Sequence, residues 1–242
     1  MQQNLPKLAI ISDVHIGSPF LLRHKFLAFL NALPRNGTLI LNGDTIDNPY
    51  QDLSSEDRAV LERLAERSHE INIIWIEGNH DQDYRPGHPG DMSFVKEYTV
   101  EDKRLLVSHG SYFDNVMPCH RWFIKLFKCL HRLRVKIGAP PVHVAEYAKK
   151  WRLLYNYLHN TVIRNAIEHA KENGYRAVSC GHVHEAEHVI VDGIEYVNTG
   201  AWTEEPLCYA TLEDGVIHLM KWQGAEKAPQ RLKHPGTSGE PD

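Results

Sequence analysis

The sequence predicts an α/β fold, and three observations support this prediction. Short apolar runs rich in β-branched residues recur along the 242 residues and are typical of buried strands. Amphipathic helical patterns lie between the first three of these runs, which favours strands joined by helices. A polar cluster follows each run, at the position where sheets of this class bind ligands.

The apolar runs define the predicted strands. They span residues 8–12, 38–42, 71–77, 105–108 and 177–180. Helical patterns cover residues 21–33 and 55–70, and Ser54 precedes the second pattern as a predicted N-cap. Further along, Asp192-Gly193 and Asp214-Gly215 are hairpin signals between short strands. The C-terminal part is therefore predicted to be antiparallel.

The chain is predicted to be one domain with an insertion. Residues 1–222 form this domain, since a chain of this length supports one large core. Between about residues 111 and 174 no strand pattern occurs, and two helical stretches are joined by Gly138-Ala139-Pro140-Pro141, which predicts an inserted helical cap. Residues 223–242 are rich in Pro, Gly and charge without periodicity, so they are predicted to be a disordered tail.

Composition argues against a membrane-spanning or disulfide-rich protein. Hydrophobic residues make up 42% of the chain and charged residues 24%, and no run approaches the roughly 18 apolar residues of a membrane helix. The first residues carry no small-residue cleavage site, which argues against a signal peptide. Four cysteines without a C-x-x-C pair are typical of reduced core residues. These features predict a cytoplasmic protein.

One segment of the predicted cap is strongly basic. The net charge of the chain is −4, yet residues 120–136 hold six Lys or Arg and no acidic residue. Helical spacing gives this segment one apolar and one basic face, with Arg121, Lys125 and Lys128 as candidate contacts. Two alternatives stay open: the apolar face packs on the second cap helix, or the segment lies peripherally on the inner face of a membrane. Nucleic acid is a weaker candidate partner, because the aromatic residues do not form an exposed stacking platform.

Five polar clusters follow the five predicted strands. They are Asp13-Val14-His15, Gly43-Asp44-Thr45-Ile46-Asp47, Gly78-Asn79-His80-Asp81, His109-Gly110 and Gly181-His182-Val183-His184. Strand ends meet in an open α/β sheet, so one site is predicted, and the glycines suit close approach of the backbone to a ligand. Carboxylate, imidazole and amide oxygen without thiolate suit Mn²⁺, Fe or Zn²⁺. Two such cations about 3.5–4 Å apart can activate water for attack on a phosphoryl group.

The ordered motifs D-x-H, GD-x-x-D, GNHD, H-G and G-H-x-H resemble those of the calcineurin-like metallophosphoesterase family. The resemblance implies a sandwich of two sheets flanked by helices, in α/β/β/α order. It also implies two divalent cations, with Mn²⁺ favoured and Fe or Zn²⁺ as alternatives. The implied ligands are Asp13, His15, Asp44 and His184 for one ion, and Asp44, Asn79, His109 and His182 for the other, with Asp44 bridging.

The resemblance assigns further roles around these ligands. His80 would face the substrate, where it can protonate the leaving oxygen or stabilise developing charge. Asp81 would fix the tautomer of His80. Asp47 would orient metal ligands without binding the metal itself.

The motifs also favour one branch of the family. Asn48 and Asp81 stand where protein phosphatases of the family carry Arg and Glu, which argues against that branch. The helical cap and residues 174–182 and 196–202 resemble the UDP-2,3-diacylglucosamine hydrolases, which implies cleavage of a diphosphate in a lipid-linked nucleotide sugar. Those enzymes carry Arg at the position of His80. The alternatives are a general or cyclic-nucleotide phosphodiesterase, and a non-catalytic metal-binding scaffold.

Overall fold

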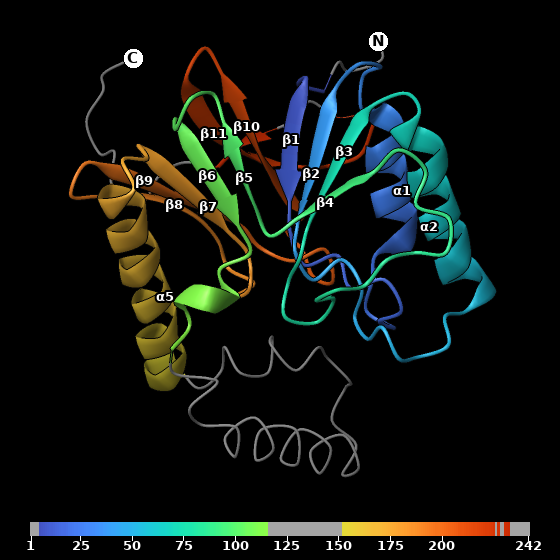
Figure 1. Ribbon diagram of the computed structural model, residues 1–242, viewed down its shortest axis with the longest axis horizontal. Helices are drawn as coiled ribbons and strands as arrows, with labels where there is room; N and C mark the ends of the chain where they lie inside the picture. The colour runs from blue at the N-terminus through green and yellow to red at the C-terminus, as the bar shows by residue number, and fades with distance from the viewer. Residues whose placement is uncertain (1–4, 116–151, 226, 228–229, 233–242) are drawn as a thin grey trace.

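The computed structural model describes residues 5–115, 152–225, 227 and 230–232. These residues form four layers, in which two mixed β-sheets pack face to face and helices cover both outer faces (Figure 1). The first sheet is covered by α1 (Arg23–Ala32) and α2 (Ser55–Ser68), and the second by α5 (Arg152–Glu172). The predicted α/β/β/α sandwich is confirmed.

The first sheet contains seven strands in the order β12-β11-β10-β1-β2-β3-β4. The strands are β1 (Leu8–Ile11), β2 (Thr38–Asn42), β3 (Asn72–Ile76), β4 (Ser93–Val95), β10 (Cys208–Glu213), β11 (Val216–Lys221) and β12 (Gln230–Arg231). The strands β1 to β4 run parallel, and β10 joins β1 in the antiparallel direction. The carboxyl ends of β1, β2 and β3 therefore lie at one edge.

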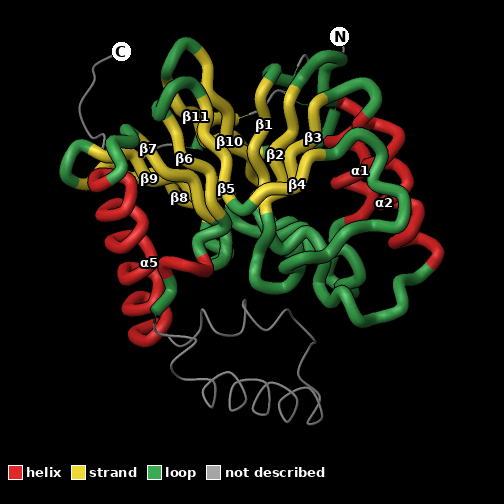
Figure 2. Tube along the Cα trace, viewed as in Figure 1, coloured by secondary structure: helices red, strands yellow, loops and turns green. Residues whose placement is uncertain are grey.

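The second sheet contains five strands in the order β5-β6-β7-β9-β8. The strands are β5 (Glu97–Val100), β6 (Leu105–Ser108), β7 (Ala177–Cys180), β8 (Ala186–Val191) and β9 (Ile194–Thr199). Because β6 and β7 are parallel, their carboxyl ends also lie together. The loops that follow them face the same side of the sandwich as the loops of the first sheet (Figure 2).

Alternating side chains give each sheet two apolar faces. In β1, Ile10 packs in the core between the sheets, while Ala9 and Ile11 pack with α1 and α2. In β6, Val107 belongs to the core between the sheets and Leu106 packs with α5. Each large apolar side chain buried in this way contributes roughly 1.5–3 kcal/mol. The strands that carry the polar loops are thus anchored on both faces.

Local signals in the sequence have the predicted structure. The Ser54 hydroxyl accepts a hydrogen bond from the backbone N–H of Asp57 at 3.1 Å and caps α2. Asp192 and Asp214 adopt left-handed backbone, with φ of 52° and 49°, in the turns of the β8–β9 and β10–β11 hairpins. The predicted hairpins are confirmed.

Three features differ from the sequence-based prediction. β9 pairs antiparallel with β8 but parallel with β7, so the C-terminal part is not wholly antiparallel. The short strands β4 and β5 were not predicted, since neither has a long apolar run. Within the predicted disordered tail, Gln230–Arg231 forms β12 because it pairs with the edge strand β11.

Most of the predicted cap lies outside the described residues. Arg121, Lys125 and Lys128 lie there, so their contact with substrate or membrane stays a prediction. The described helix α5 packs on the second sheet through Val162 and Ala166. Within the described ranges, no helix is both long and apolar enough to cross a membrane.

Candidate metal centre

The predicted site residues come together on the loops that follow β1, β2, β3, β6 and β7. Three groups of ligand atoms occur there, and the atoms within each group lie within 4.8 Å of one another. His15, Asp47 and His80 form a partly exposed group, and the other two groups are buried. Of the buried groups, the first consists of Asp13, His15 and His184, and the second of Asp13, Asp44 and His109. Asp13 belongs to both, so the two groups adjoin.

The backbone at most of the predicted ligands is left-handed. The value of φ is 54° at Asp13, 53° at His15, 50° at Asp44, 66° at His182 and 56° at His184. Asp and His adopt this region more readily than most residues, yet it still costs about 1 kcal/mol or more at each position. The packed strands on either side hold these turns, which direct the side chains across the edge of the sandwich.

Glycines allow the loops to approach one another closely. A Cβ atom at Gly43 would collide with the imidazole of His109, and one at Gly78 would collide with the carboxylate of Asp44. Any other residue at either position would separate the loops that carry the site. These glycines therefore allow close contact between the loops, and the predicted approach of the backbone to a ligand stays a prediction.

In the first group, two imidazoles and a carboxylate point toward a common region. His184 Nε2 lies 3.1 Å from Asp13 Oδ1 and 3.4 Å from His15 Nε2. All three residues are buried. Two imidazole nitrogens, those of His15 and His184, face the same Asp13 oxygen. Ligands of a bound cation have this arrangement.

In the second group, His109 faces the carboxylate of Asp44. His109 Nε2 lies 3.2 Å from Asp44 Oδ2 and 3.3 Å from Asn79 Oδ1. The Nδ1 atom of His109 lies 3.0 Å from the carbonyl oxygen of Asn42 and donates to it. This bond fixes the ring and leaves Nε2 directed toward Asp44 and Asn79.

The charges of these buried groups depend on one another. Burial alone would raise the pKa of Asp13 and Asp44, but His184 and His109 outweigh this effect and lower both pKa values. Burial would lower the pKa of His109, yet the Asp44 carboxylate raises it. The two carboxylates therefore carry negative charge, and the raised pKa of His109 favours a proton on its ring beside Asp44. A divalent cation supplies the same positive charge and competes with that proton.

The donor set fits divalent metal ions. The buried carboxylates, imidazoles and nearby amide oxygen are ligands of Mn²⁺, Fe and Zn²⁺. The adjoining His and Asp groups are consistent with a dinuclear centre. Which of these ions binds, and whether Asp44 bridges them, stay predictions.

Asp47 contacts two of the predicted histidines. Its Oδ1 atom lies 3.0 Å from His15 Nδ1. The other ring nitrogen of His15, Nε2, faces His184 and Asp13. Its backbone carbonyl accepts a hydrogen bond from His80 Nδ1 at 2.6 Å. His80 Nε2 is then 3.9 Å from Asp44 Oδ2, on a side chain that is 39% exposed. His80 thus lies at the open side of the buried groups.

The predicted contact between Asp81 and His80 is wrong. The Asp81 carboxylate is fully buried and accepts hydrogen bonds from the backbone N–H groups of Thr45, Ile46 and Gly78 and from the indole of Trp75. These donors draw the carboxylate into the core beneath the loops. The carbonyl of Asp47 orients His80 instead.

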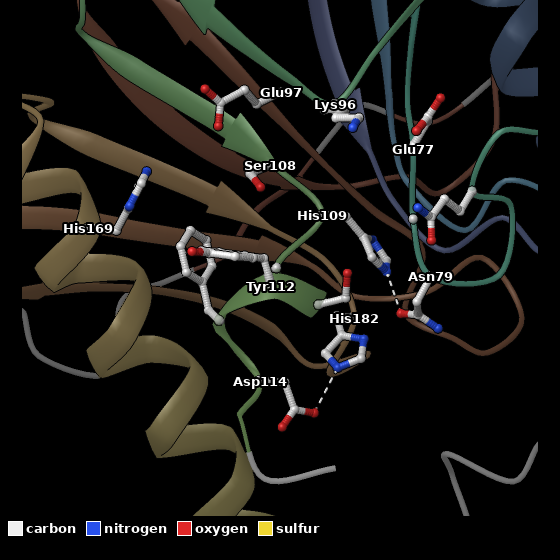
Figure 3. Close-up of a pocket in the computed structure, with 15 residues that line it drawn as sticks. Glu77, Asn79, Lys96, Glu97, Ser108, His109, Tyr112, Asp114, His169 and His182 are labelled. Carbon is white, nitrogen blue, oxygen red and sulfur yellow. Dashed lines mark hydrogen bonds and ion pairs between the residues drawn. The ribbon is translucent and has the colours of Figure 1, made fainter. Parts of the chain in front are cut away.

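Asp114 is a part of the site that the sequence patterns missed. Its Oδ2 atom lies 2.9 Å from His182 Nε2 (Figure 3), and its side chain is buried. This contact directs Nε2 of His182 toward Asp114, so Nδ1 is the nitrogen available to a metal ion. Asp114 ends the short 3₁₀ helix η1 (Ser111–Phe113) that follows His109 and Gly110. No motif marks it.

Replacing Asp114 with Ala is expected to weaken binding of one metal ion about 10- to 100-fold, the usual effect of losing a residue that orients a histidine ligand. Calorimetric titration of chelator-treated protein with Mn²⁺ measures this change. Asp114→Asn keeps a hydrogen-bond acceptor and should restore part of the affinity. Asp91→Ala is the matched control, because Asp91 contacts the exposed His69 at 2.7 Å outside the site. Unchanged Mn²⁺ affinity in Asp114→Ala would contradict the assigned role.

Solved structures similar to this chain include three proteins of low sequence identity. Wild-type Vps29 complexed with Zn²⁺ from Entamoeba histolytica is 16% identical, with 93% of this chain and 97% of that chain covered and a TM-score of 0.48. The phosphoesterase YfcE from E. coli is 16% identical, with 87% and 90% covered and a TM-score of 0.44. The nuclease MPE from Pseudomonas putida is 17% identical, with 93% and 87% covered and a TM-score of 0.46.

A search of curated proteins found no match. The family model described as calcineurin-like phosphoesterase matches residues 6–186, which include every predicted metal ligand. This match covers most of the chain and agrees with the order of motifs in the sequence. The chain belongs to the calcineurin-like phosphoesterase family.

Proposed function

We propose that this chain is a di-metal hydrolase of phosphate esters or diphosphates. One observation supports the proposal most strongly. Buried Asp13 and Asp44 lie among histidines, on loops that follow strands of both sheets. Two divalent cations bound there would activate water and neutralise the charge of a phosphoryl group. Asp13, His15, Asp44 and His184 would hold one ion, and Asp44, Asn79, His109 and His182 the other.

His80 is the residue that we propose to act on the substrate. His80 Nδ1–H donates to the Asp47 carbonyl, so Nε2 is the nitrogen that can face the substrate. A doubly protonated His80 would give its Nε2 proton to a leaving oxygen and become the neutral Nδ1–H form. The partial exposure of its side chain supports access to a substrate, whereas the metal ligands Asp13 and His109 are buried.

Replacing His80 with Ala is expected to leave metal content unchanged and to slow turnover about 100- to 10,000-fold, the usual contribution of general acid–base catalysis. Turnover of bis-p-nitrophenyl phosphate and metal analysis of the same sample measure the two quantities. His24→Ala is the control, since His24 is exposed on α1. Full turnover in His80→Ala would contradict the role.

Hydrolysis of bis-p-nitrophenyl phosphate also tests the function itself. Chelator-treated protein should be inactive and should recover turnover when Mn²⁺ is added. If Mn²⁺, Fe²⁺ and Zn²⁺ all bind but none restores turnover, the chain is a metal-binding scaffold and the proposal fails.

The proposed substrate is a lipid-linked nucleotide sugar with a diphosphate, which the resemblance of residues 174–182 and 196–202 supports. A general or cyclic-nucleotide phosphodiesterase is the alternative. Turnover of UDP-diacylglucosamine, compared with that of cyclic AMP and bis-p-nitrophenyl phosphate, separates these classes.

A further inference from the structure

A cavity of about 870 Å³ opens beside the second group of ligands. Asn79, His109 and His182 line one end of it, and η1 and α5 contribute the wall on the other side (Figure 3). The first group of ligands does not line this cavity: neither His15 nor His184 takes part. A molecule with its phosphate at the metal centre could therefore extend into the cavity on the His182 side.

Tyr112 presents an aromatic ring to this cavity. The residue is 85% exposed, although it lies next to the buried Phe113. The two rings meet edge to face, with centroids 5.9 Å apart and planes at 73°. Gly110, with φ of 99°, turns the chain directly after His109 and so begins η1 beside the metal centre. The position of Tyr112 is thus tied to that of a predicted metal ligand.

Polar side chains also form part of the cavity wall. Gln82, Lys96, Ser108 and Ser111 line the same cavity. Lys96 makes no ion pair with any residue in the described part of the chain. A flat ring with polar edges can stack on Tyr112 and hydrogen-bond to these groups.

We propose that this cavity binds the nucleoside portion of a phosphorylated substrate, with its base stacked on Tyr112. The proposal rests on the proposed function for the position of the phosphate, and it assigns the nucleoside to the His182 side of the centre.

Equilibrium binding of two related phosphates tests this assignment in the presence of Mn²⁺. Adenosine 5′-monophosphate carries adenine where ribose 5-phosphate has its anomeric hydroxyl, so a residue that stacks on the base affects the first more than the second. Tyr112→Ala is expected to raise the Kd of the nucleotide about 10-fold more than that of the sugar phosphate. Tyr112→Phe keeps the ring and should restore the difference. Tyr50→Ala is the matched control, because Tyr50 is 96% exposed and does not line the cavity.

The binding results distinguish a nucleoside site from an acyl site, and they separate the cavity assignment from the hydrolase function. Equal effects of Tyr112→Ala on both ligands, or no measurable binding of the nucleotide, overturn the assignment. Tighter binding of n-octyl phosphate than of the nucleotide, lost in Tyr112→Ala, would show an acyl site instead. If nucleotide binding depends on Tyr112 but bis-p-nitrophenyl phosphate is not hydrolysed, the cavity assignment stands and the proposed hydrolase function fails.

Discussion

Replacing Asp44 with Asn is expected to abolish turnover and to weaken metal binding by at least about 100-fold, since losing a residue that only orients a ligand already costs 10- to 100-fold. Asp44 is 2% exposed and lies 3.2 Å from His109 Nε2. Asn has the same shape but carries no charge, so it cannot balance a divalent cation. Metal analysis after dialysis and turnover of bis-p-nitrophenyl phosphate measure the two losses.

The structure of the protein should survive this change. The backbone N–H of His80 donates to Asp44 Oδ1 at 2.8 Å, and the Asn carbonyl can accept the same bond. An unchanged circular dichroism spectrum would therefore separate loss of metal from loss of fold. Asp52→Asn is the control, because Asp52 is exposed. An Asp44→Asn protein with full turnover would contradict the mechanism.

Replacing Asp81 with Ala is expected to lower the free energy of unfolding by at least about 3 kcal/mol, because each buried donor left without a partner costs about 1–3 kcal/mol. The fully buried Asp81 carboxylate accepts four hydrogen bonds, from the backbone of Thr45, Ile46 and Gly78 and from the side chain of Trp75. Urea denaturation of metal-free protein measures this loss separately from metal binding.

Two comparisons make the test specific. Asp81→Asn keeps acceptor capacity and should lose less stability than Asp81→Ala. Asp52→Ala, at an exposed position, should change the free energy of unfolding by no more than about 0.5 kcal/mol. If Asp81→Ala were as stable as the Asp52 variant, the carboxylate would have no structural role.

Local sequence signals predict the parts of this fold that local chemistry determines. Ser54 caps α2, and the Asp-Gly turns at 192–193 and 214–215 form hairpins, because each depends on residues close in the chain. The edge strand β4 (Ser93–Val95) depends on pairing with the distant β3. Its residues lack the continuous apolar pattern that identifies a buried strand.

In the candidate site, too, local sequence patterns predict some features, whereas contacts between distant residues determine others. The clusters beginning at Asp13 and Gly181 were predicted to converge because they follow buried strands, and the described loops do bring them together. The contact of Asp114 with His182 joins residues 68 positions apart and has no local signal. Asp81 was assigned to His80 because the two are neighbours in sequence, but the donors around Asp81 come from the loop after β2, from Gly78 and from Trp75.

The most direct test of a dinuclear centre is the number of metal ions bound per chain. Chelator-treated protein is titrated with Mn²⁺, dialysed and analysed for metal and for protein concentration. Two ions per wild-type chain, and loss of both in Asp44→Asn, are the predicted results. A wild-type chain that retains no Mn²⁺, Fe²⁺ or Zn²⁺ after this treatment would contradict the central claim.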